Sequence, residues 1–211
     1  MKILTVDIGT GTQDIFLYDS QIDIENGFKL ILPSPTMMIR KRIQEATRSQ
    51  VPILLGGLLM GGGPNVWAVK DHLKAGYPVY ATADAVRTVD DNLESVAEMG
   101  ITLISEDEAK ALPASVQCIE FRDFDFPAIT ETFARFGVSL DDLAAVAVAV
   151  FDHGDAPANI SDRQFRFDYL DERIREKNAL SSFAFMADDI PSIMTRLPAV
   201  ANSSQDVDAP L

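Results

Sequence analysis

The sequence predicts an α/β fold in which a mixed β-sheet opens with three antiparallel strands and is flanked by helices. Two patterns lead to this prediction. Apolar strands separated by turn residues fill the N-terminal segment, and strands then alternate with amphipathic helices through the middle of the chain. The chain has 211 residues, of which 47% are hydrophobic, so it is also long enough to bury a sizeable core.

The three opening strands are expected at residues 3–7, 14–18 and 28–32. Residues 9–12, between the first two strands, are rich in glycine and threonine, which indicates a tight turn and an antiparallel pair. A basic amphipathic helix is expected at residues 38–48, after a proline-rich stretch.

The middle of the chain alternates between strand and helix, which indicates parallel strands joined by crossover helices. We expect one continuous helix at residues 84–99, because its valines and leucine recur with the spacing of one buried helical face. The other elements follow from the same periodicities. Strands are expected at 51–55, 78–81, 101–104 and 116–122, and helices at 66–75, 106–112 and 127–137.

The most apolar strand is expected at residues 144–150, and we predict that it is the most deeply buried. Beyond it the pattern weakens. Helices are expected at residues 169–177 and 190–200, followed by a polar tail.

These patterns divide the chain into two parts. We predict an α/β domain at residues 1–156. Residues 157–211 would form a helical extension or the start of a truncated second domain. No low-complexity linker separates the two parts.

The composition excludes some classes of partner. A net charge of -14 and a pI near 4.4 argue against unaided binding to nucleic acid or to an anionic membrane, because a phosphate polymer requires a concentrated basic stripe. No uncharged run reaches the ~18 residues that span a bilayer, and Asp7 interrupts the segment where a signal peptide is apolar. We therefore expect a cytoplasmic protein, and its oligomeric state stays open.

The single cysteine, Cys118, allows neither an internal disulfide nor a cysteine-rich metal cluster. We expect it to be a small buried residue of the strand at 116–122.

The turn at residues 9–12 is the first candidate for phosphate binding. Gly9 and Gly11 permit positive φ and leave backbone N–H groups uncovered. Thr10 and Thr12 add hydroxyl donors around the same concavity. These donors favour an oxyanion, and an ordinary Gly-Thr hairpin is the alternative.

Two polar residues flank this turn. Asp7 at the end of the first strand would repel an anion directly, so we assign it to a hydrated divalent metal ion or to a catalytic water. Gln13 could position the same water. The alternative is that Asp7 is an ordinary exposed acid.

Residues 56–65 are the second candidate for anion binding, because they connect a buried strand to a helix. Gly61, Gly62 and Gly63 would let a ligand approach free amides and the positive end of the helix dipole. Lys70, further along the helix, could reach the same ligand. The segment is neither a Walker loop nor a dinucleotide fingerprint, and a flexible turn that packs helix against sheet is the alternative.

A third candidate, Asp152 with His153, follows the strand at 144–150, where open α/β sheets gather their ligands. Asp152 could bind a metal ion or act as a base, and His153 could carry protons or bind the same ion. A polar loop with a partly buried histidine is the alternative.

Arg163 and Arg166, separated by aromatic spacers, are expected on one side of an extended segment. There they could grip an anionic substrate. Surface ion pairs with the abundant carboxylates are the alternative.

The motif Asp-Ile-Gly-Thr-Gly-Thr at residues 7–12, after an apolar strand, resembles the first phosphate motif of the actin, Hsp70 and sugar-kinase superfamily. This resemblance implies the N-terminal domain of a ribonuclease-H-like, actin-like ATPase fold, with ATP and Mg²⁺ as ligands. The second phosphate hairpin and the adenosine loop of that superfamily are not found in the 211 residues.

A closer resemblance covers roughly residues 2–200. The motifs Met-Gly-Gly-Gly-Pro, Trp-Ala-Val-Lys-Asp-His-Leu, Val-Tyr-Ala-Thr, Ser-Glu-Asp-Glu-Ala and Asp-His-Gly resemble an uncharacterised prokaryotic family labelled as related to pyruvate formate-lyase activating enzyme. A radical enzyme of that kind binds an iron–sulfur cluster through three closely spaced cysteines. With Cys118 alone, we expect no iron–sulfur cluster in this chain.

Together these features predict that the chain binds a nucleotide or another small phosphorylated ligand with a divalent metal ion. We expect phosphotransferase or phosphohydrolase activity, with electrostatic positioning as the main source of rate. A non-catalytic module that senses an anion or a nucleotide is one alternative. A metal-dependent hydrolase centred on Asp152 and His153 is the other.

Overall fold

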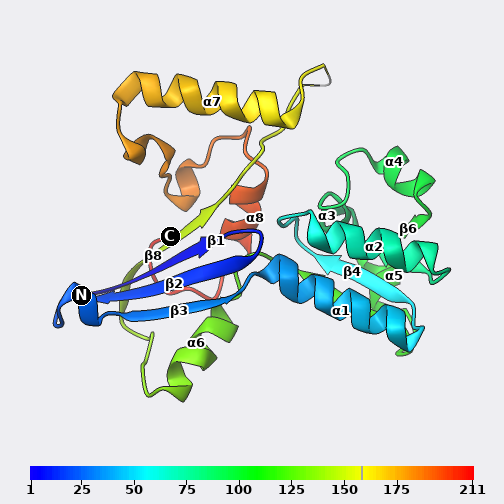
Figure 1. Ribbon diagram of the computed structural model, residues 1–211, viewed down its shortest axis with the longest axis horizontal. Coiled ribbons are helices and arrows are strands. Elements are labelled where there is room, and N and C mark those ends of the chain that lie inside the picture. Colours follow the sequence, from blue (N-terminus) through cyan, green and yellow to red (C-terminus); the bar gives the residue numbers. More distant parts are fainter. Residues whose placement is uncertain (158) are drawn as a thin grey trace. The chain divides into compact units, whose positions relative to one another are not determined.

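The structure is a computed structural model that describes residues 1–157 and 159–211 (Figure 1). It confirms a mixed α/β architecture, with one mixed and one parallel four-stranded sheet among the described residues and helices flanking both. The contacts group the chain into two compact units. Unit 1 comprises Met1–Asp7, Phe16–Lys29 and Asp125–Leu211, and unit 2 comprises Ile8–Ile15 and Leu30–Phe124.

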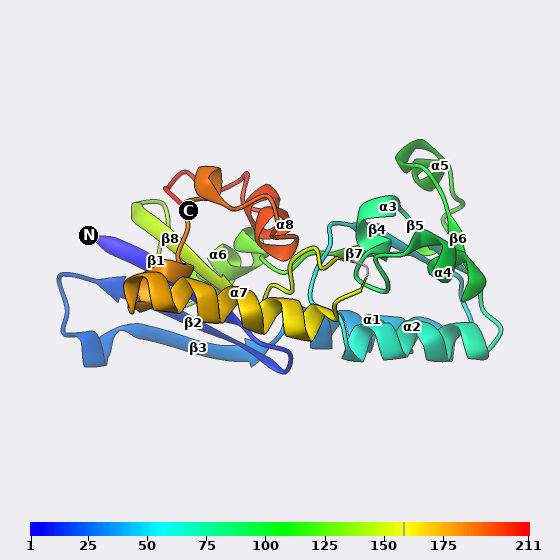
Figure 2. The ribbon, with the colours of Figure 1, turned by 90° about the horizontal axis from the view of Figure 1, so that it is seen from above.

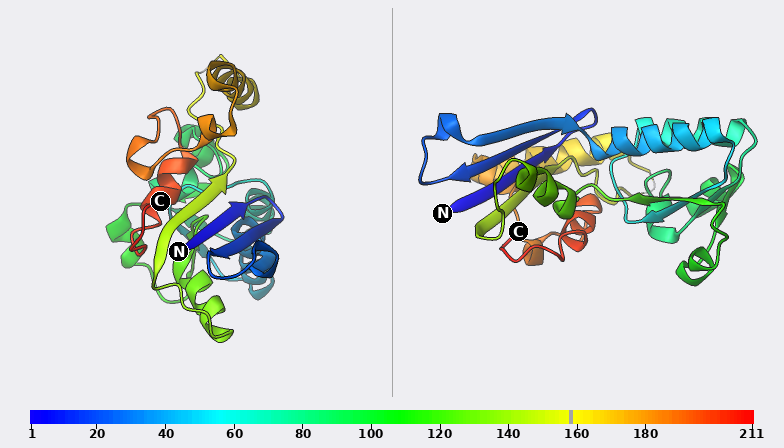
Figure 3. Two further views of the ribbon diagram at one scale, coloured as in Figure 1. Left: turned by 90° about the vertical axis from the view of Figure 1, so that its left-hand side faces the viewer. Right: turned by 90° about the horizontal axis from the view of Figure 1, so that it is seen from below.

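The first sheet has the strand order β3-β2-β1-β8. Burial alternates along the first two strands, with Leu4 and Val6 of β1 and Leu17 of β2 inside, which is the period expected of half-buried strands. Figure 3 shows β8 beside β1. The bounds are β1 Lys2–Ile8, β2 Thr12–Asp19, β3 Phe28–Pro33 and β8 Leu143–Val150.

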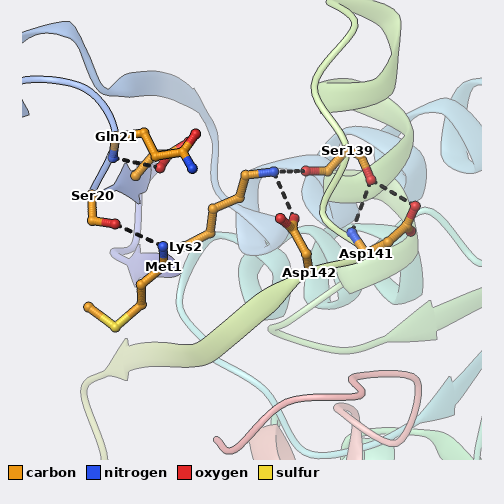
Figure 4. A network of polar contacts seen from close by, with 8 residues as sticks. Met1, Lys2, Ser20, Gln21, Ser139, Asp141 and Asp142 are labelled. Atoms are coloured by element: carbon orange, nitrogen blue, oxygen red, sulfur yellow. Dashed lines mark hydrogen bonds and ion pairs between the residues drawn. The ribbon is translucent and has the colours of Figure 1, made fainter.

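Polar contacts hold the start of β1 against the loop that precedes β8 (Figure 4). Lys2 Nζ donates to Asp142 Oδ1 at 2.7 Å and to the Ser139 carbonyl at 3.4 Å. The hydrogen bond from Lys2 lowers the pKa of Asp142 below its usual value. The N-terminal ammonium donates to Ser20 at 2.8 Å, so the start of β1 is also tied to the residue that follows β2.

The prediction that the strand at 144–150 is the most buried is wrong. Ala144, Ala147 and Ala149 of β8 are exposed, and Val146 is the one residue of the strand that is fully buried. The strand lies at the end of the sheet order and alternates small alanines with valines, so only one of its faces is covered. Four of the five residues of β4 are buried instead.

The second sheet is parallel and has the order β6-β5-β4-β7. The chain moves outward from β4 to β5 and β6 and then returns to the other side of β4 to add β7. Its core is a cluster that includes Ile53 and Leu55 of β4 and Phe121 of β7. The bounds are β4 Ile53–Gly57, β5 Val79–Ala81, β6 Ile101–Leu103 and β7 Gln117–Phe121.

Two long helices accompany this sheet, α1 (Pro35–Ser49) and α2 (Pro64–Lys74). They lie side by side in Figure 1 and one in front of the other in Figure 2, and both begin with a proline in the first helical turn. His72 of α2 reaches Thr47 of α1 in the interior, where its Nδ1 lies 2.8 Å from the threonine hydroxyl.

The continuous helix predicted at 84–99 is wrong, because the segment contains two short helices, α3 (Ala83–Val86) and α4 (Leu93–Glu98). Asp90 accepts a hydrogen bond from the Asn92 amide, and the Asn92 side chain caps α4. Such local bonds from Asp and Asn compete with the helical ladder and break it. The capped helix α5 (Glu106–Lys110) follows β6.

The extended segment predicted around Arg163 and Arg166 is also wrong. It forms the start of α7 (Asp162–Lys177), because the Ser161 hydroxyl accepts a hydrogen bond from the Gln164 amide and caps the helix. The other helical elements of unit 1 are α6 (Phe126–Arg135), α8 (Arg196–Asn202) and the 3₁₀ segments η1 (Ile24–Asn26), η2 (Leu180–Phe183) and η3 (Ala187–Asp189).

The expectation that Cys118 is buried is wrong as well. Cys118 and Glu120 point to the exposed face of β7, whereas Ile119 and Phe121 point to the core. Among the residues that the structure describes, no helix is long and apolar enough to span a bilayer.

Candidate functional site

The turn between β1 and β2, residues 9–12, is exposed and closed by a hydrogen bond from the Gly9 amide to the Thr12 carbonyl at 3.0 Å. Neither Gly9 nor Gly11 takes a left-handed φ, so the predicted reason for these two glycines is wrong. Within the described residues, the Thr10 and Gly11 amides have no hydrogen-bond partner. The Thr12 hydroxyl donates to Asp14 at 3.2 Å, so the turn offers two free amides beside one carboxylate.

Ser34, the N-cap of α1, fastens this turn. Its amide donates to the Gly11 carbonyl at 3.1 Å, and its hydroxyl donates to the Thr10 carbonyl at 2.6 Å. The same hydroxyl accepts from the Met37 amide and caps the helix. Ser34 is fully buried, and its hydrogen bonds join the turn to the start of α1.

Thr36, two residues further along α1, contacts the segment that we call the glycine loop, residues 58–63 between β4 and α2. Its hydroxyl donates to the Gly61 carbonyl at 3.0 Å, and the Asn65 side chain donates to the same carbonyl at 3.0 Å. Both side chains are buried. The start of α1 therefore connects the two glycine-containing turns of unit 2.

Asp123, which lies two residues after the neighbouring parallel strand β7, supports the glycine loop. Both of its carboxylate oxygens lie 3.2 Å from the Gly61 amide, and the side chain is 2% exposed. Because Asp123 lies just beyond the carboxyl end of β7, the carboxyl ends of β4 and β7 meet at this loop. In open parallel sheets, ligands bind where the strand order reverses, and here it reverses between β4 and β7.

Gly62 and Gly63 complete the loop. In the part of the chain that the structure describes, neither amide has a hydrogen-bond partner, and both residues are half-buried. Gly63 has a φ of 90°, which favours glycine, and it directly precedes the 11-residue helix α2. Two free amides thus lie at the positive end of a helix dipole.

The other residues predicted for this site have different surroundings. Lys70 is exposed on α2, and Asp7 is exposed near the end of β1. Gln13 donates its side-chain amide to the Pro33 carbonyl at 3.1 Å, which fixes that side chain to β3. The predictions of a metal-binding role for Asp7 and of water positioning by Gln13 stay predictions.

In unit 1, Asp152 holds the start of α8. Its carboxylate accepts hydrogen bonds from the amides of Gly154, Thr195, Arg196 and Leu197 at 2.7 to 3.3 Å, and from the Thr195 hydroxyl at 3.2 Å. Two carboxylate oxygens offer about four lone-pair sites, so these donors occupy the carboxylate. The geometry is that of a helix cap.

His153 pairs with Arg166, whose Nη1 lies 2.9 Å from His153 Nδ1. The pKa of His153 is lowered from its usual value, first by partial burial of the imidazole and then by the charge of Arg166. The Arg166 guanidinium also lies over the Phe151 ring at 4.3 Å. The neutral form of the imidazole is therefore favoured.

Asp152, His153 and Arg166 all line one cavity of about 90 Å³, which we call the α7 pocket. The sequence interpretation treated Arg166 as separate from the other two, and the helical conformation of α7 brings them together. Arg163 is exposed and is not among the lining residues. Among residues 1–157 and 159–211, no three His, Cys, Asp or Glu side chains are grouped so that they could hold a metal ion.

A comparison with models of protein families shows which family the chain belongs to. The family model described as "Putative pyruvate format-lyase activating enzyme (DUF1786)" matches residues 60–210, which is more than half of the chain. The chain belongs to the DUF1786 family. None of the curated proteins matches it.

In this DUF1786 chain, the family match begins inside the glycine loop and ends after α8. Gly61–Gly63, Asp123 and the residues of the α7 pocket lie within it, whereas the turn at residues 9–12 precedes it.

The family's description suggests a radical enzyme, and such enzymes bind an iron–sulfur cluster through cysteine thiolates. This chain has one cysteine, and it is exposed on β7. One cysteine cannot supply the thiolates that hold an iron–sulfur cluster, so no radical step is assigned to the chain.

Sequence reasoning missed Ser34, Thr36 and Asp123. The Ser-Pro pair at residues 34–35 is a helix-start signal that could have identified Ser34. For Asp123 the available signal was its position just after a predicted parallel strand, where polar residues gather around ligands.

Proposed function

We propose that the glycine loop binds a phosphate group of a small phosphorylated ligand, with a nucleotide as the leading candidate. The observation that carries this proposal is the pair of unpartnered amides at Gly62 and Gly63, at the N-terminal end of α2. Free amides and a helix dipole together form a favourable site for an oxyanion. The location at the reversal of strand order supports the same proposal.

The turn at residues 9–12 would contribute to the same ligand site. Ser34 joins it to the start of α1, and Thr36 joins that helix to Gly61, so the two loops are held by one element. The exposed amides of Thr10 and Gly11 are suited to a second anionic group, such as another phosphate of a nucleotide.

The buried Asp123 sets the direction from which an anion enters. The Asp123 carboxylate already holds the Gly61 amide, so an anion would bind on the side of Gly62 and Gly63, away from that charge. The net charge of -14 also disfavours a bare polyanion, and Mg²⁺ would reduce this repulsion. Mg²⁺ is commonly held by substrate phosphates with one or two carboxylates, and Asp7 stays our candidate for that role.

The first sheet supports the more specific part of the proposal, an actin-like, ribonuclease-H-like domain whose first three strands are antiparallel. In the order β3-β2-β1-β8, those three strands are neighbours, as such a domain requires. Phosphotransferase or phosphohydrolase activity would follow from that fold.

A module that binds the ligand without turnover is the second candidate. The Gln13 amide is engaged by the Pro33 carbonyl, and the Asp152 carboxylate is engaged by the start of α8. Gln13 and Asp152 are two of the four residues expected to act in catalysis, with Asp7 and His153, and in this conformation both serve structural contacts.

The test replaces Val66, which lies in the first turn of α2, with glutamate. A negative charge there favours the helix but competes with a bound phosphate, so the protein should fold while ATP binding weakens about tenfold or more. Val66→Gln is the neutral control. Calorimetry with ATP, ADP and inorganic phosphate, each with and without Mg²⁺, measures the effect.

Two outcomes contradict the proposal: no binding of any of these ligands by the unmodified protein, or equal binding by Val66→Glu and Val66→Gln. Phosphate release from bound ATP distinguishes the enzyme from the non-catalytic module.

A further inference from the structure

The α7 pocket has an apolar interior and a cationic edge. Its wall is formed by side chains from the end of β8, from α7, from η2 and from α8 with the residues that precede them. The apolar part of the wall includes Val150, Phe165, Leu170, Phe183, Phe185 and Leu197. All of the lining residues belong to unit 1, so this pocket is separate from the glycine loop.

Arg166 carries an unused donor at this pocket. Its Nη1 is paired with His153, but its Nε is buried and has no hydrogen-bond partner. A guanidinium has five N–H donors, and a buried donor without an acceptor is destabilising. The hydrogen-bonding capacity of Arg166 is therefore only partly used by the residues that the structure describes.

The neighbouring charges leave Arg166 as the group that would bind an anion. Asp152 lines the pocket too, but backbone amides at the start of α8 surround its carboxylate. His153 accepts from Arg166 at Nδ1, so we assign its proton to Nε2, where it is a second donor. The charge of Asp162 raises the pKa of His153, and the charge of Arg196 lowers it.

We infer that the α7 pocket binds a short-chain aliphatic carboxylate, whose hydrocarbon body lies in the pocket and whose carboxylate pairs with Arg166. A cavity of about 90 Å³ is smaller than the ~150 Å³ cavity that holds a benzene ring, so it suits a chain of about three to five carbons. Arginine forms two parallel hydrogen bonds with carboxylates, so a carboxylate matches its geometry better than a hydroxyl does.

Butyrate is the probe, tested on the full chain by calorimetry or by NMR titration. Acetate has the charge without the hydrocarbon body, and 1-butanol has the body without the charge. The unmodified protein should bind butyrate more tightly than either of them by about tenfold or more.

Three variants separate the contributions. Arg166→Gln should weaken butyrate binding about tenfold and leave 1-butanol unchanged. Arg163→Gln, one turn earlier on the same helix and outside the pocket, should leave butyrate binding unchanged. Leu170→Phe fills the cavity and should abolish binding of both ligands, and thermal unfolding of each variant verifies that it folds.

The inference is overturned if the unmodified protein does not bind butyrate at about 10 mM, a very weak affinity for a specific site. It is also overturned if acetate binds as tightly as butyrate, or if Arg163→Gln and Arg166→Gln weaken binding equally. Val66→Glu, which tests the glycine loop, should have no effect on butyrate, so the two proposals fail independently.

Discussion

The imidazole of His72 lies 2.8 Å from the hydroxyl of Thr47, and this contact joins α2 to α1 inside unit 2. The Thr47 hydroxyl also donates to the Ile43 carbonyl at 2.8 Å, so we assign the hydrogen between the two side chains to Nδ1 of a neutral His72. Burial lowers the pKa of His72 below 6.5, and the Pro78 carbonyl opposes this shift to a smaller extent.

This contact predicts that the protein loses stability in mild acid. The unfolded chain takes up a proton at His72 near pH 6.5, whereas the folded protein resists protonation to a lower pH. Stability is therefore complete above about pH 6.5 and falls below it, by at most about 1.4 kcal/mol per pH unit for one group. Urea unfolding at pH 5, 6, 7 and 8 measures the effect.

His72→Gln should reduce this pH dependence, and His153→Gln, at the surface of unit 1, should reduce it less. An unchanged loss of stability between pH 7 and pH 5 in His72→Gln would show that the buried histidine is not responsible.

Gly57 at the end of β4 should not tolerate a side chain. Its φ is 89°, and an added Cβ would lie 2.4 Å from the Phe121 carbonyl of β7. Gly57→Ala should therefore cost more than about 2 kcal/mol of unfolding free energy. Gly56→Ala is the matched control, because a Cβ there meets nothing within 4 Å, and its cost should stay below about 1 kcal/mol. Equal costs would argue against the close approach of β4 and β7.

Asp152 should contribute to folding through α8. Asp152→Ala removes the acceptor for three successive amides, Thr195 to Leu197, and should cost about 2 kcal/mol. Asp155→Ala, at an exposed acid three residues later, should cost little. Thermal unfolding with and without EDTA is the measurement. A loss of stability in EDTA that disappears in Asp152→Ala would instead support the predicted metal-binding role.

Cys118 should react slowly with thiol reagents although it is exposed. Burial of part of the thiol raises its pKa, and the charge of Glu120 raises it further. Labelling at pH 7.5 should be slower than labelling of free cysteine. Glu120→Gln should accelerate it about two- to threefold, because loss of the negative charge lowers the pKa of the thiol. Asp107→Asn is the control, and acceleration by both substitutions would indicate a general effect of net charge.

The order of strands and helices in the parallel sheet was predictable because each element carries its own periodicity. The strand predicted at 51–55 overlaps β4, and the helix predicted at 66–75 overlaps α2. The predicted helix bounds were wrong where Ser, Asp and Asn side chains form hydrogen bonds with nearby backbone amides. Asn92 divides the helix predicted at 84–99, and Ser161 starts α7 earlier than its apolar pattern indicates.

The candidate sites were predictable only in part. Gly61–Gly63 lie between β4 and α2 as predicted, since glycines at a strand–helix junction are visible in a single sequence. The support of this loop by Asp123 was not visible, because the two residues are 62 positions apart and meet only when β7 pairs with β4. The contact between Arg166 and His153 likewise requires the unexpected first turns of α7.

Unit 1 is assembled from three separate stretches of chain, whereas unit 2 takes all but Ile8–Ile15 from the single run Leu30–Phe124. A ribosome releases residues in order, so every strand of the parallel sheet has emerged before β8, the partner of β1, has been synthesised. Folding of that sheet on the nascent chain shortens the loop that β1 and β8 must close and lowers its entropic cost. Biosynthesis therefore favours an order of folding in which unit 2 folds first and unit 1, whose last strand is synthesised later, folds last.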